Sequence, residues 1–329
     1  MRRKQSQNPC CKGKNIHYGK RRRQCSTCKR VWTIRPKKRG RKRQRLPRKL
    51  LERLLKDRYT LHQSLTLWDQ RSYVSLRHLT RQSLQCYVQQ TRSYPLAKKG
   101  HLILVIDGKW FRFQGKEWVL YLMALRPVNS SQAVLMDPVL LPGKEYSSKW
   151  RKVFQTLPLP FKFRVCALVS DGLRGINTLA NEQGWVYQRC HFHLLREALL
   201  RLGVKRKSPS SSLRLHIFQT LREFLIPQNE KSLSLALEQL YSSVNQPELS
   251  SRCRRVLRDF LRHRFFFHTY RQYPQYHLPT TTNALESYSS LLAKRLSSIR
   301  SPKALLLWTT AFIRMNPTIT CNGKQNQQN

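Results

Sequence analysis

The sequence predicts a mixed α/β fold, in which a sheet is flanked by helices. Two runs of aliphatic residues, Leu102–Ile106 and Val165–Val169, have the length and continuity of strands that are buried on both faces. Each run leads into an Asp-Gly pair, at Asp107 and at Asp171. Between residue 101 and about residue 200, strand-like segments alternate with segments that have apolar residues at helical spacing. This alternation is typical of a sheet with helices packed on it.

The charge of the chain indicates a polyanionic partner. The 329 residues include 63 Lys and Arg but only 16 Asp and Glu, which gives a net charge of +47. A basic ribosomal or membrane-surface protein is the alternative interpretation. No apolar run reaches the roughly 20 residues that a membrane span requires, and the basic N-terminus lacks the apolar core of a signal peptide. We therefore expect a cytoplasmic protein that does not associate with membranes.

Residues 1–48 form a basic arm that contains a candidate zinc site. The first 50 residues carry 21 Lys or Arg and no acid. Cys25 and Cys28 form a Cys-x-x-Cys pair, and Cys11 lies 14 residues before it. This spacing suits part of a zinc ribbon, and a metal would explain how so short a segment folds. His17 is a candidate fourth ligand. The alternative is a disordered basic arm with incidental thiols.

Residues 49–95 are expected to be helical. Leucines recur at helical spacing between residues 50 and 55, a second candidate helix follows Thr60, and a third opens at Val74. Two or three short helices with basic faces fit a helix-turn-helix segment that binds DNA. A plain linking bundle explains the same pattern.

Residues 100–196 are expected to form the sheet and its helices. The first two strands are joined as a hairpin around Gln114–Gly115. The expected order is three strands, a helix, a strand, a helix and a strand, at residues 102–113, 117–127, 132–142, 147–157, 164–171, 173–183 and 185–190.

Asp107 and Asp171 are candidate ligands of a cation. If the first and fourth strands are neighbours, the two carboxylates meet at one edge of the sheet, where they repel each other unless a cation holds them. Hard oxygen ligands favour Mg²⁺ or Mn²⁺, and paired ions of this kind support phosphodiester displacement. The alternative is that each Asp-Gly pair simply closes a turn.

Two further candidate sites follow in the chain. Cys190 and His193 are three residues apart at the start of an expected helix, either as structural metal ligands or as a buried contact. Residues 197–278 are Leu-rich and basic and are expected to form a helical insertion, and residues 279–315 return to the sheet as helices. Glu286 in this last segment is a candidate third carboxylate, or else the partner of Asn283 in a capping box. Residues 316–329 are expected to be a tail.

Four segments in this order, VIDGKW, LVSDGLRGI, QRCHFHLLRE and TTNALESYSSLLAKRL, together resemble the mutator-type DDE transposases of bacterial insertion sequences. The resemblance covers residues 101 to about 312. It implies an RNase H-like catalytic core interrupted by an all-helical insertion. Asp107, Asp171 and Glu286 fall on its three catalytic positions, and Cys190 and His193 fall on its Cys-x-x-His element.

The resemblance also implies the chemistry and the partners. Asp107 would contact both of two Mg²⁺ or Mn²⁺ ions, while Asp171 and Glu286 would each hold one. Water would cleave the phosphodiester at the transposon end, and the released 3′-hydroxyl would attack the target. The partners would be double-stranded DNA and further copies of the chain, as a homodimer or larger assembly, at the nucleoid.

These transposases often carry a zinc ribbon followed by a helix-turn-helix segment. In this chain Ser6 occupies the position of one expected ligand, which leaves Cys11, Cys25 and Cys28 as candidate zinc ligands. Two other functions remain open: a non-catalytic DNA-binding protein derived from such an element, and an RNase H-like nuclease that cleaves without joining.

Overall fold

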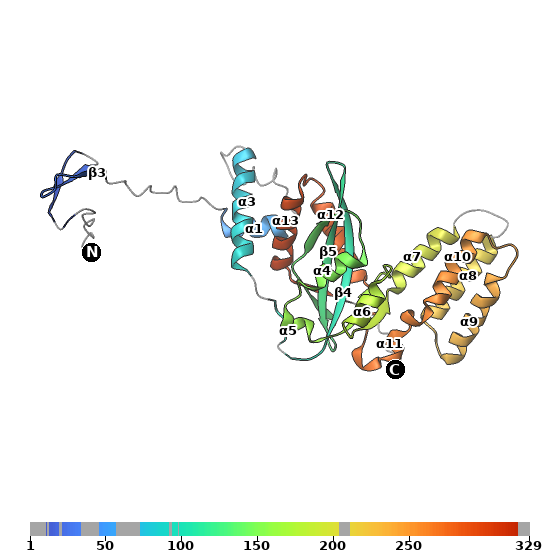
Figure 1. The fold of residues 1–329 in the computed structure, drawn as a ribbon. Helices are drawn as coiled ribbons and strands as arrows, with labels where there is room; N and C mark the ends of the chain where they lie inside the picture. The colour runs from blue at the N-terminus through green and yellow to red at the C-terminus, as the bar shows by residue number, and fades with distance from the viewer. Residues whose placement is uncertain are drawn as a thin grey trace. The chain divides into compact units, whose positions relative to one another are not determined.

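The computed structural model describes residues 11, 13–19, 22–33, 46–56, 73–91, 94–97, 99–203 and 211–321, which form two compact units, Met1–Leu46 and Pro47–Asn329 (Figure 1). The second helix expected after Thr60 lies outside the described residues, as do Ser6 and the segment 322–329. Each unit is described by itself below.

The first unit is built on a small antiparallel sheet. Its strands, in the order β1-β2-β3, are β1 (Asn15–His17), β2 (Arg22–Cys25) and β3 (Val31–Thr33). Asn15 pairs with Cys25, so the end of β2 lies beside the start of β1. Cys25 is fully buried, whereas most other described residues in these strands are exposed or half-buried. With so little apolar burial, a sheet of this size needs a further source of stability.

The second unit contains a seven-stranded mixed sheet, which confirms the predicted α/β class. Its main path is β10-β6-β5-β4-β8-β9, and β7 pairs with β5. Strands β5 and β6 run antiparallel to their neighbours, whereas β4, β8 and β9 are mutually parallel. The strands are β4 (Leu102–Phe113), β5 (Lys116–Pro127), β6 (Gln132–Leu135), β7 (Val139–Pro142), β8 (Val165–Ser170), β9 (Val186–Arg189) and β10 (Thr318–Thr320).

The hairpin between β4 and β5 forms where the sequence predicts it. Phe113 pairs with Lys116, and the two turn residues Gln114 and Gly115 both have positive φ, at 49° and 76°. A two-residue turn with both φ angles positive matches the right-handed twist of the flanking strands. The hairpin therefore fixes the register of the two longest strands.

Two details of the sheet differ from the sequence prediction. The expected third strand is broken at Met136–Pro138 into β6 and β7, both paired with β5. Strand β10 forms within the expected tail and pairs with β6. Strand β4 continues past Asp107 to Phe113, as the sequence predicts. Its pairing with β8 is recorded only as far as Val105, so Asp107 lies just beyond the parallel neighbour.

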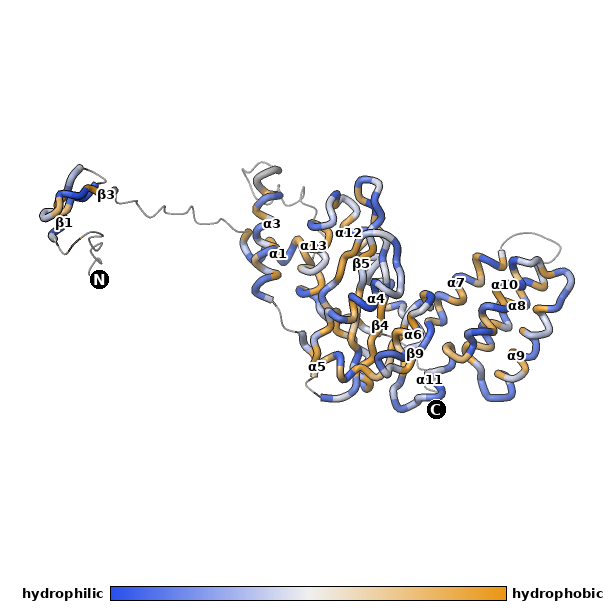
Figure 2. The backbone as a smooth tube through the Cα atoms, viewed as in Figure 1, coloured by the Kyte–Doolittle hydropathy of each residue, from blue (hydrophilic) through white to orange (hydrophobic). Residues whose placement is uncertain are grey.

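One face of the sheet packs against two helices. Alternate residues of β4, from Leu102 to Ile106, join a core with helices α4 (Ser147–Phe154) and α6 (Ile176–Glu182). Trp150 lies at the centre, with its ring 4.7 Å from that of Tyr121 in an edge-on contact. Figure 2 shows the hydrophobic residues concentrated along the central strands. The short helix α5 (Leu159–Lys162) leads from α4 to β8.

Helices α12 (Asn283–Arg295) and α13 (Pro302–Met315) follow the insertion, and α12 packs on β4 and β5. Helices α1 (Arg48–Lys56) and α3 (Tyr73–Gln90) pack on α13. The buried side of α1 consists of leucines, as the spacing predicts: Leu51, Leu54 and Leu55.

The segment between β9 and α12 has a hydrophobic core of its own. Helices α7 (His191–Leu202), α8 (Ser211–Leu225), α9 (Glu230–Val244) and α10 (Ser251–Arg262) bury their apolar sides against one another. The expected boundary between residues 196 and 197 falls inside α7, which is one continuous helix.

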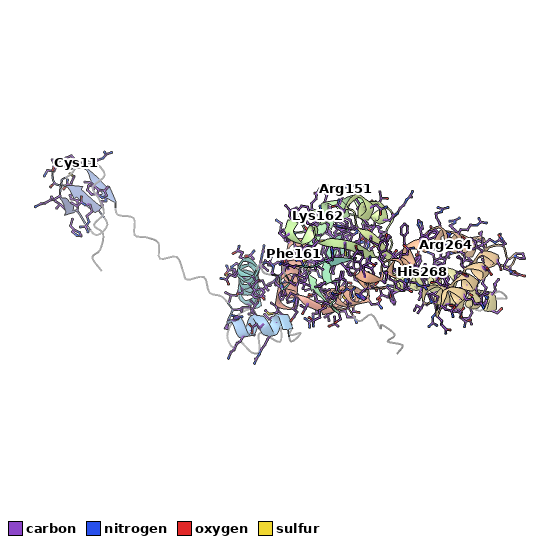
Figure 3. All side chains as sticks on the ribbon, turned by 90° about the horizontal axis from the view of Figure 1, so that it is seen from below. Cys11, Arg151, Phe161, Lys162, Arg264 and His268 are labelled. Carbon is purple, nitrogen blue, oxygen red and sulfur yellow. The ribbon has the colours of Figure 1, made fainter. Side chains whose placement is uncertain are left out.

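The chain returns from this bundle through η1 (Arg264–Phe267), α11 (Thr269–Gln272) and η2 (Pro274–Tyr276). His268 in this segment packs edge-on against Phe224 of α8, with ring centroids 4.6 Å apart. Figure 3 labels Arg264 and His268 beside the bundle. The returning segment is thus anchored to the bundle before α12 begins.

Candidate functional site

Asp107 lies in β4, and Asp171 directly follows the neighbouring parallel strand β8. Val105 of β4 pairs with Val169 of β8, so Asp107 and Asp171 each lie two residues further along the chain. Strand pairs with this register carry their side chains to the same end of the sheet. Asp171 is fixed as the start of a turn, because its Oδ1 accepts the backbone N–H of Leu173 at 3.1 Å. The structure therefore juxtaposes the first two predicted acidic residues.

Glu286 approaches from helix α12, which packs on β4. The helix begins at Asn283 after Thr282, and no side chain caps its first turn. The capping-box interpretation of Glu286 is therefore wrong. Its Oε1 lies 2.7 Å from Nε2 of His193, and both side chains are largely buried, at 17% and 23% exposure. Glu286 is thus held by an ion pair to helix α7.

Cys190 and His193 join the start of α7 to the start of α12. The backbone N–H of Thr282 donates to Cys190 Sγ at 3.3 Å, and the Thr282 hydroxyl lies 3.4 Å from the same sulfur. The backbone N–H of His191 donates to Thr280 at 2.8 Å. Cys190 and His193 therefore form a hydrogen-bonded contact that positions Glu286. Among the described residues they are not part of a cluster of three metal-ligand atoms.

Burial raises the pKa of Asp107 to about 6, and the carboxylates of Glu286 and Asp171 raise it as well. A hydrogen bond with Ser289 and the charge of His193 oppose this shift. The three predicted acidic residues, from three separate segments of the chain, are therefore close enough for their charges to interact.

Burial lowers the pKa of His193, but hydrogen bonds with Cys190 and Glu286 outweigh this effect and raise the pKa to about 10. The imidazole ring is therefore protonated at neutral pH. It places one positive charge beside the Glu286 carboxylate.

The structure adds a fourth carboxylate, Glu145, which the sequence reasoning missed. Glu145 lies in the loop before α4, and its Oε1 accepts the indole N–H of Trp150 at 2.8 Å. A methyl group at Gly108 would overlap its carboxylate. Burial raises the pKa of Glu145 to about 7, and the charges of Asp171 and Asp107 add to the shift. The only sequence signal is the glycine after Asp107, which leaves room for this approach.

These four acidic residues suit a divalent cation. They are a quarter of the 16 acids in the chain, yet no Lys or Arg nitrogen of the described residues lies within 4.0 Å of any of their carboxylates. Partly buried carboxylates that repel one another are stabilised by a shared cation, and oxygen ligands favour Mg²⁺ or Mn²⁺. Asp107, Asp171 and Glu286 do not, however, bring three ligand atoms within 4.8 Å of one another.

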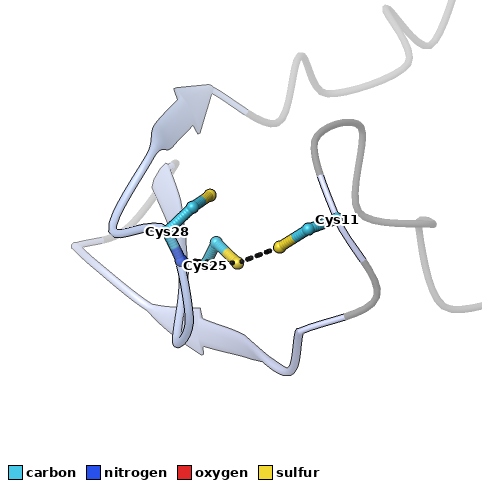
Figure 4. A group of neighbouring side chains, drawn as sticks. All are labelled: Cys11, Cys25 and Cys28. Carbon is cyan, nitrogen blue, oxygen red and sulfur yellow. Dashed lines mark hydrogen bonds between the residues drawn. The ribbon is translucent and has the colours of Figure 1, made fainter.

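The first unit contains a second candidate metal site. Cys11, Cys25 and Cys28 have their sulfur atoms within 4.8 Å of one another and could hold a metal ion such as zinc (Figure 4). The Sγ atoms of Cys11 and Cys25 are 3.1 Å apart, and Cys25 Sγ accepts the backbone N–H of Cys28 at 3.5 Å. His17 is not a member of the described group, because it lies two residues along β1 from the level of Cys25. The described group therefore consists of the three cysteines, and His17 as a fourth ligand stays a prediction.

Gly13 closes the cysteine cluster on one side. A methyl group at this position would lie 2.8 Å from Cys25 Sγ and would overlap the Thr27 side chain. A side chain at residue 13 would therefore displace Cys25 Sγ or the Thr27 side chain.

Two comparisons of the chain with known proteins identify no relative. No family model matches the chain, and a search of curated proteins finds no match. In the described part of the chain, no helix combines the length and apolar character required to cross a membrane.

Proposed function

We propose that this protein is a DDE-type transposase with an RNase H-like core, related to the mutator-type transposases of insertion sequences. The observation that carries the proposal is the convergence of three segments on Asp107 of the central strand β4. Asp171 follows the neighbouring parallel strand β8, Glu286 lies on the packed helix α12, and the charges of both add to the rise in the pKa of Asp107. The sheet supports it, because three antiparallel strands are followed by two parallel strands in the order β6-β5-β4-β8-β9. The net charge of +47 supports DNA as the substrate.

Asp107, Asp171 and Glu286 would hold two Mg²⁺ or Mn²⁺ ions, with Glu145 as an additional oxygen donor. The ions would polarise the phosphodiester and stabilise the charge that develops on its oxygens. His193 would orient the Glu286 carboxylate through the 2.7 Å contact and balance its charge until a cation is bound. The hydrogen bond between Thr282 and Cys190 would hold the start of α12 beside the start of α7, so that Glu286 reaches Asp107.

The remaining parts of the chain would bind DNA and further copies of the protein. The cysteine cluster would hold structural zinc, and helices α1 and α3 would belong to a DNA-binding segment. Cleavage and joining of two DNA ends would require a dimer or a larger assembly at the nucleoid.

The test is DNA strand transfer by the purified full-length chain. The substrate is DNA that carries the coding gene with its flanking sequence, in the presence of Mn²⁺. We expect Asp107→Asn to lower end cleavage and joining by at least about 100-fold, because it removes a charge that the reaction requires. Glu117→Gln, on β5 and partly exposed, is the matched control and should leave both steps unchanged.

Joining by Asp107→Asn at the wild-type rate would contradict the proposal. Cleavage by the wild-type chain without joining would instead indicate a nuclease. DNA binding without either step would indicate a non-catalytic DNA-binding protein.

A further inference from the structure

Arg189 is the last residue of β9 and lies directly beside the acidic site. It pairs with Ser170 of β8, the residue that precedes Asp171. Its side chain crosses Gly172, where a methyl group would overlap its Nε. Gly172 has a φ of 98°, a conformation that favours glycine. The backbone next to Asp171 is therefore shaped to admit this arginine.

The guanidinium group of Arg189 is held in place by an aromatic ring. Its Cζ lies 5.2 Å from the centroid of Phe267, which is fully buried. The carbonyl oxygen of Phe267 is fixed in turn, because it accepts hydrogen bonds from His191 Nε2 at 2.7 Å and from Gln188 Nε2 at 3.1 Å. A cation over such a ring is attracted to it, but the ring accepts no in-plane N–H donors. The ring therefore holds the guanidinium in place without accepting its in-plane N–H donors.

Within the described residues, Arg189 has no hydrogen-bond or ion-pair partner for its side chain. Its Nε is buried without an acceptor, and no carboxylate oxygen lies within 4.0 Å of the guanidinium. Four other described arginines have a buried Nε without an acceptor. Three of them donate through another nitrogen to a backbone carbonyl, namely Arg126, Arg254 and Arg295, whereas no such bond is recorded among the described residues for Arg214 on α8, away from the acidic site. Burying guanidinium N–H donors without acceptors costs folding free energy. An external anion beside Asp171 would supply the missing acceptors.

We propose that Arg189 binds a non-bridging oxygen of the DNA phosphate that lies beside Asp171, and so positions that phosphate against the acidic site. This inference rests on the proposed function. The planar fork of an arginine matches two phosphate oxygens, and a guanidinium in this place offsets the negative charge that four carboxylates present to an incoming phosphate. Its donors also stabilise the charge that builds up on the phosphate oxygens during displacement.

The experiment compares Arg189→Gln and Arg189→Lys with the wild-type full-length chain. We expect Arg189→Gln to lower the rate of DNA cleavage in Mn²⁺ by about 100- to 1,000-fold. Arg189→Lys should be intermediate, because it keeps the charge and the aliphatic stem but loses the fork. Arg214→Gln on α8 removes another arginine with a buried, unpaired Nε, and its rate should stay within about twofold of the wild type.

A second measurement does not depend on catalysis. The affinity for a short DNA duplex is measured in Ca²⁺ over a range of salt concentrations. Loss of one phosphate contact should reduce the slope of log affinity against log salt by about 1 in Arg189→Gln. A merely structural role would lower the melting temperature of the variant but leave the slope and the rate per folded molecule unchanged.

The outcomes separate this inference from the proposed function. If the wild type cleaves DNA and Arg189→Gln matches it in rate and slope, the inference is overturned and the proposed function stands. If the wild type does not cleave but the slope falls in Arg189→Gln, the phosphate contact stands and the proposed function fails. If the wild type does not cleave and the slope is unchanged, both fail.

Discussion

The carboxylates of Asp107 and Glu145 approach the middle of β4 from opposite faces of the sheet. Side chains alternate along a strand, so Asp107 points away from the face of Gly108, over which Glu145 lies. Trp150 and Tyr121 lie on the Glu145 face, and the hydrogen bond of Asp107 with Ser289 shows that Asp107 points towards α12. The absent side chain at Gly108 allows the two carboxylates to influence each other across the strand.

The burial of these two carboxylates, with the repulsion of neighbouring acids added to it, predicts a dependence of stability on pH. The pKa of Asp107 is raised to about 6 and that of Glu145 to about 7, so the folded chain keeps protons that the unfolded chain has already lost. The contribution of both residues to stability therefore falls as the pH rises between about 4 and 7. We expect Asp107→Asn to stabilise the protein by about 1–2 kcal/mol at pH 8 without divalent ions, measured by thermal unfolding in EDTA.

The difference between Asp107→Asn and the wild type should shrink at pH 5 and should also shrink when Mn²⁺ is added at pH 8. Glu117→Gln is the control and should show neither trend. Equal stability of Asp107→Asn and the wild type across this pH range would show that the ionised Asp107 is destabilised neither by burial nor by the neighbouring acids.

Glu145→Gln separates the charge of Glu145 from its packing. The amide oxygen of glutamine keeps an acceptor for the Trp150 indole N–H, while the negative charge is lost. We expect weaker binding of Mn²⁺ by the folded variant, measured by isothermal titration calorimetry, with wild-type or higher stability in EDTA. Unchanged Mn²⁺ affinity would show that Glu145 does not contribute to metal binding and only holds Trp150 of α4 in place.

Among the helices and strands, α13 connects the N-terminal helices of the second unit to the sheet. Arg314 near its end donates from Nε to Asp137 Oδ1 at 2.9 Å, in the break between β6 and β7. A second nitrogen donates to the carbonyl oxygens of Val88 and Thr91 at the end of α3. One side chain thus satisfies acceptors from three segments that are distant in the sequence.

Arg314→Ala should therefore destabilise the second unit by about 2–4 kcal/mol, because it leaves the Asp137 carboxylate and two helix-end carbonyls without their donor. Arg112→Ala is the control. Its side chain is 73% exposed and lies 3.8 Å from Glu117, so its loss should change the unfolding free energy by less than about 0.5 kcal/mol. Urea denaturation measures both values. An effect of Arg314→Ala no larger than that of Arg112→Ala would contradict this role.

At the scale of the whole molecule, the two units are stabilised differently. The second unit has two large hydrophobic cores, one beneath the sheet and one in the helical bundle. The first unit has a three-stranded sheet and a cluster of three cysteines. A structural zinc site needs four ligands, of which these thiols supply three.

Cys28→Ser should consequently affect only the first unit. We expect about one zinc ion per wild-type chain and much less in the variant, measured by elemental analysis. We expect the unfolding transition of the second unit to be unchanged, because the substitution lies outside its two hydrophobic cores. Cys86→Ser, in helix α3 and outside the cluster, is the control for zinc content. A wild-type chain without bound zinc would contradict the prediction.

The strand and helix pattern of the second unit was predictable because it is local. Continuous apolar runs marked β4, β5 and β8, and the turn at Gln114–Gly115 marked the hairpin between β4 and β5. The break between β6 and β7 was not predictable from the local sequence, because it depends on how both strands pair with β5. The same is true of β10, which is defined by its pairing with β6.

The sequence by itself determined the candidate acids Asp107, Asp171 and Glu286, because each stands next to an apolar pattern whose periodicity can be read locally. Only the tertiary structure decided which groups surround them. Glu145 lies over Gly108, His193 holds Glu286, and Arg189 lies over Gly172. These contacts depend on the register of separate strands and on the direction in which helices return to the sheet, and no short-range pattern in the sequence encodes either.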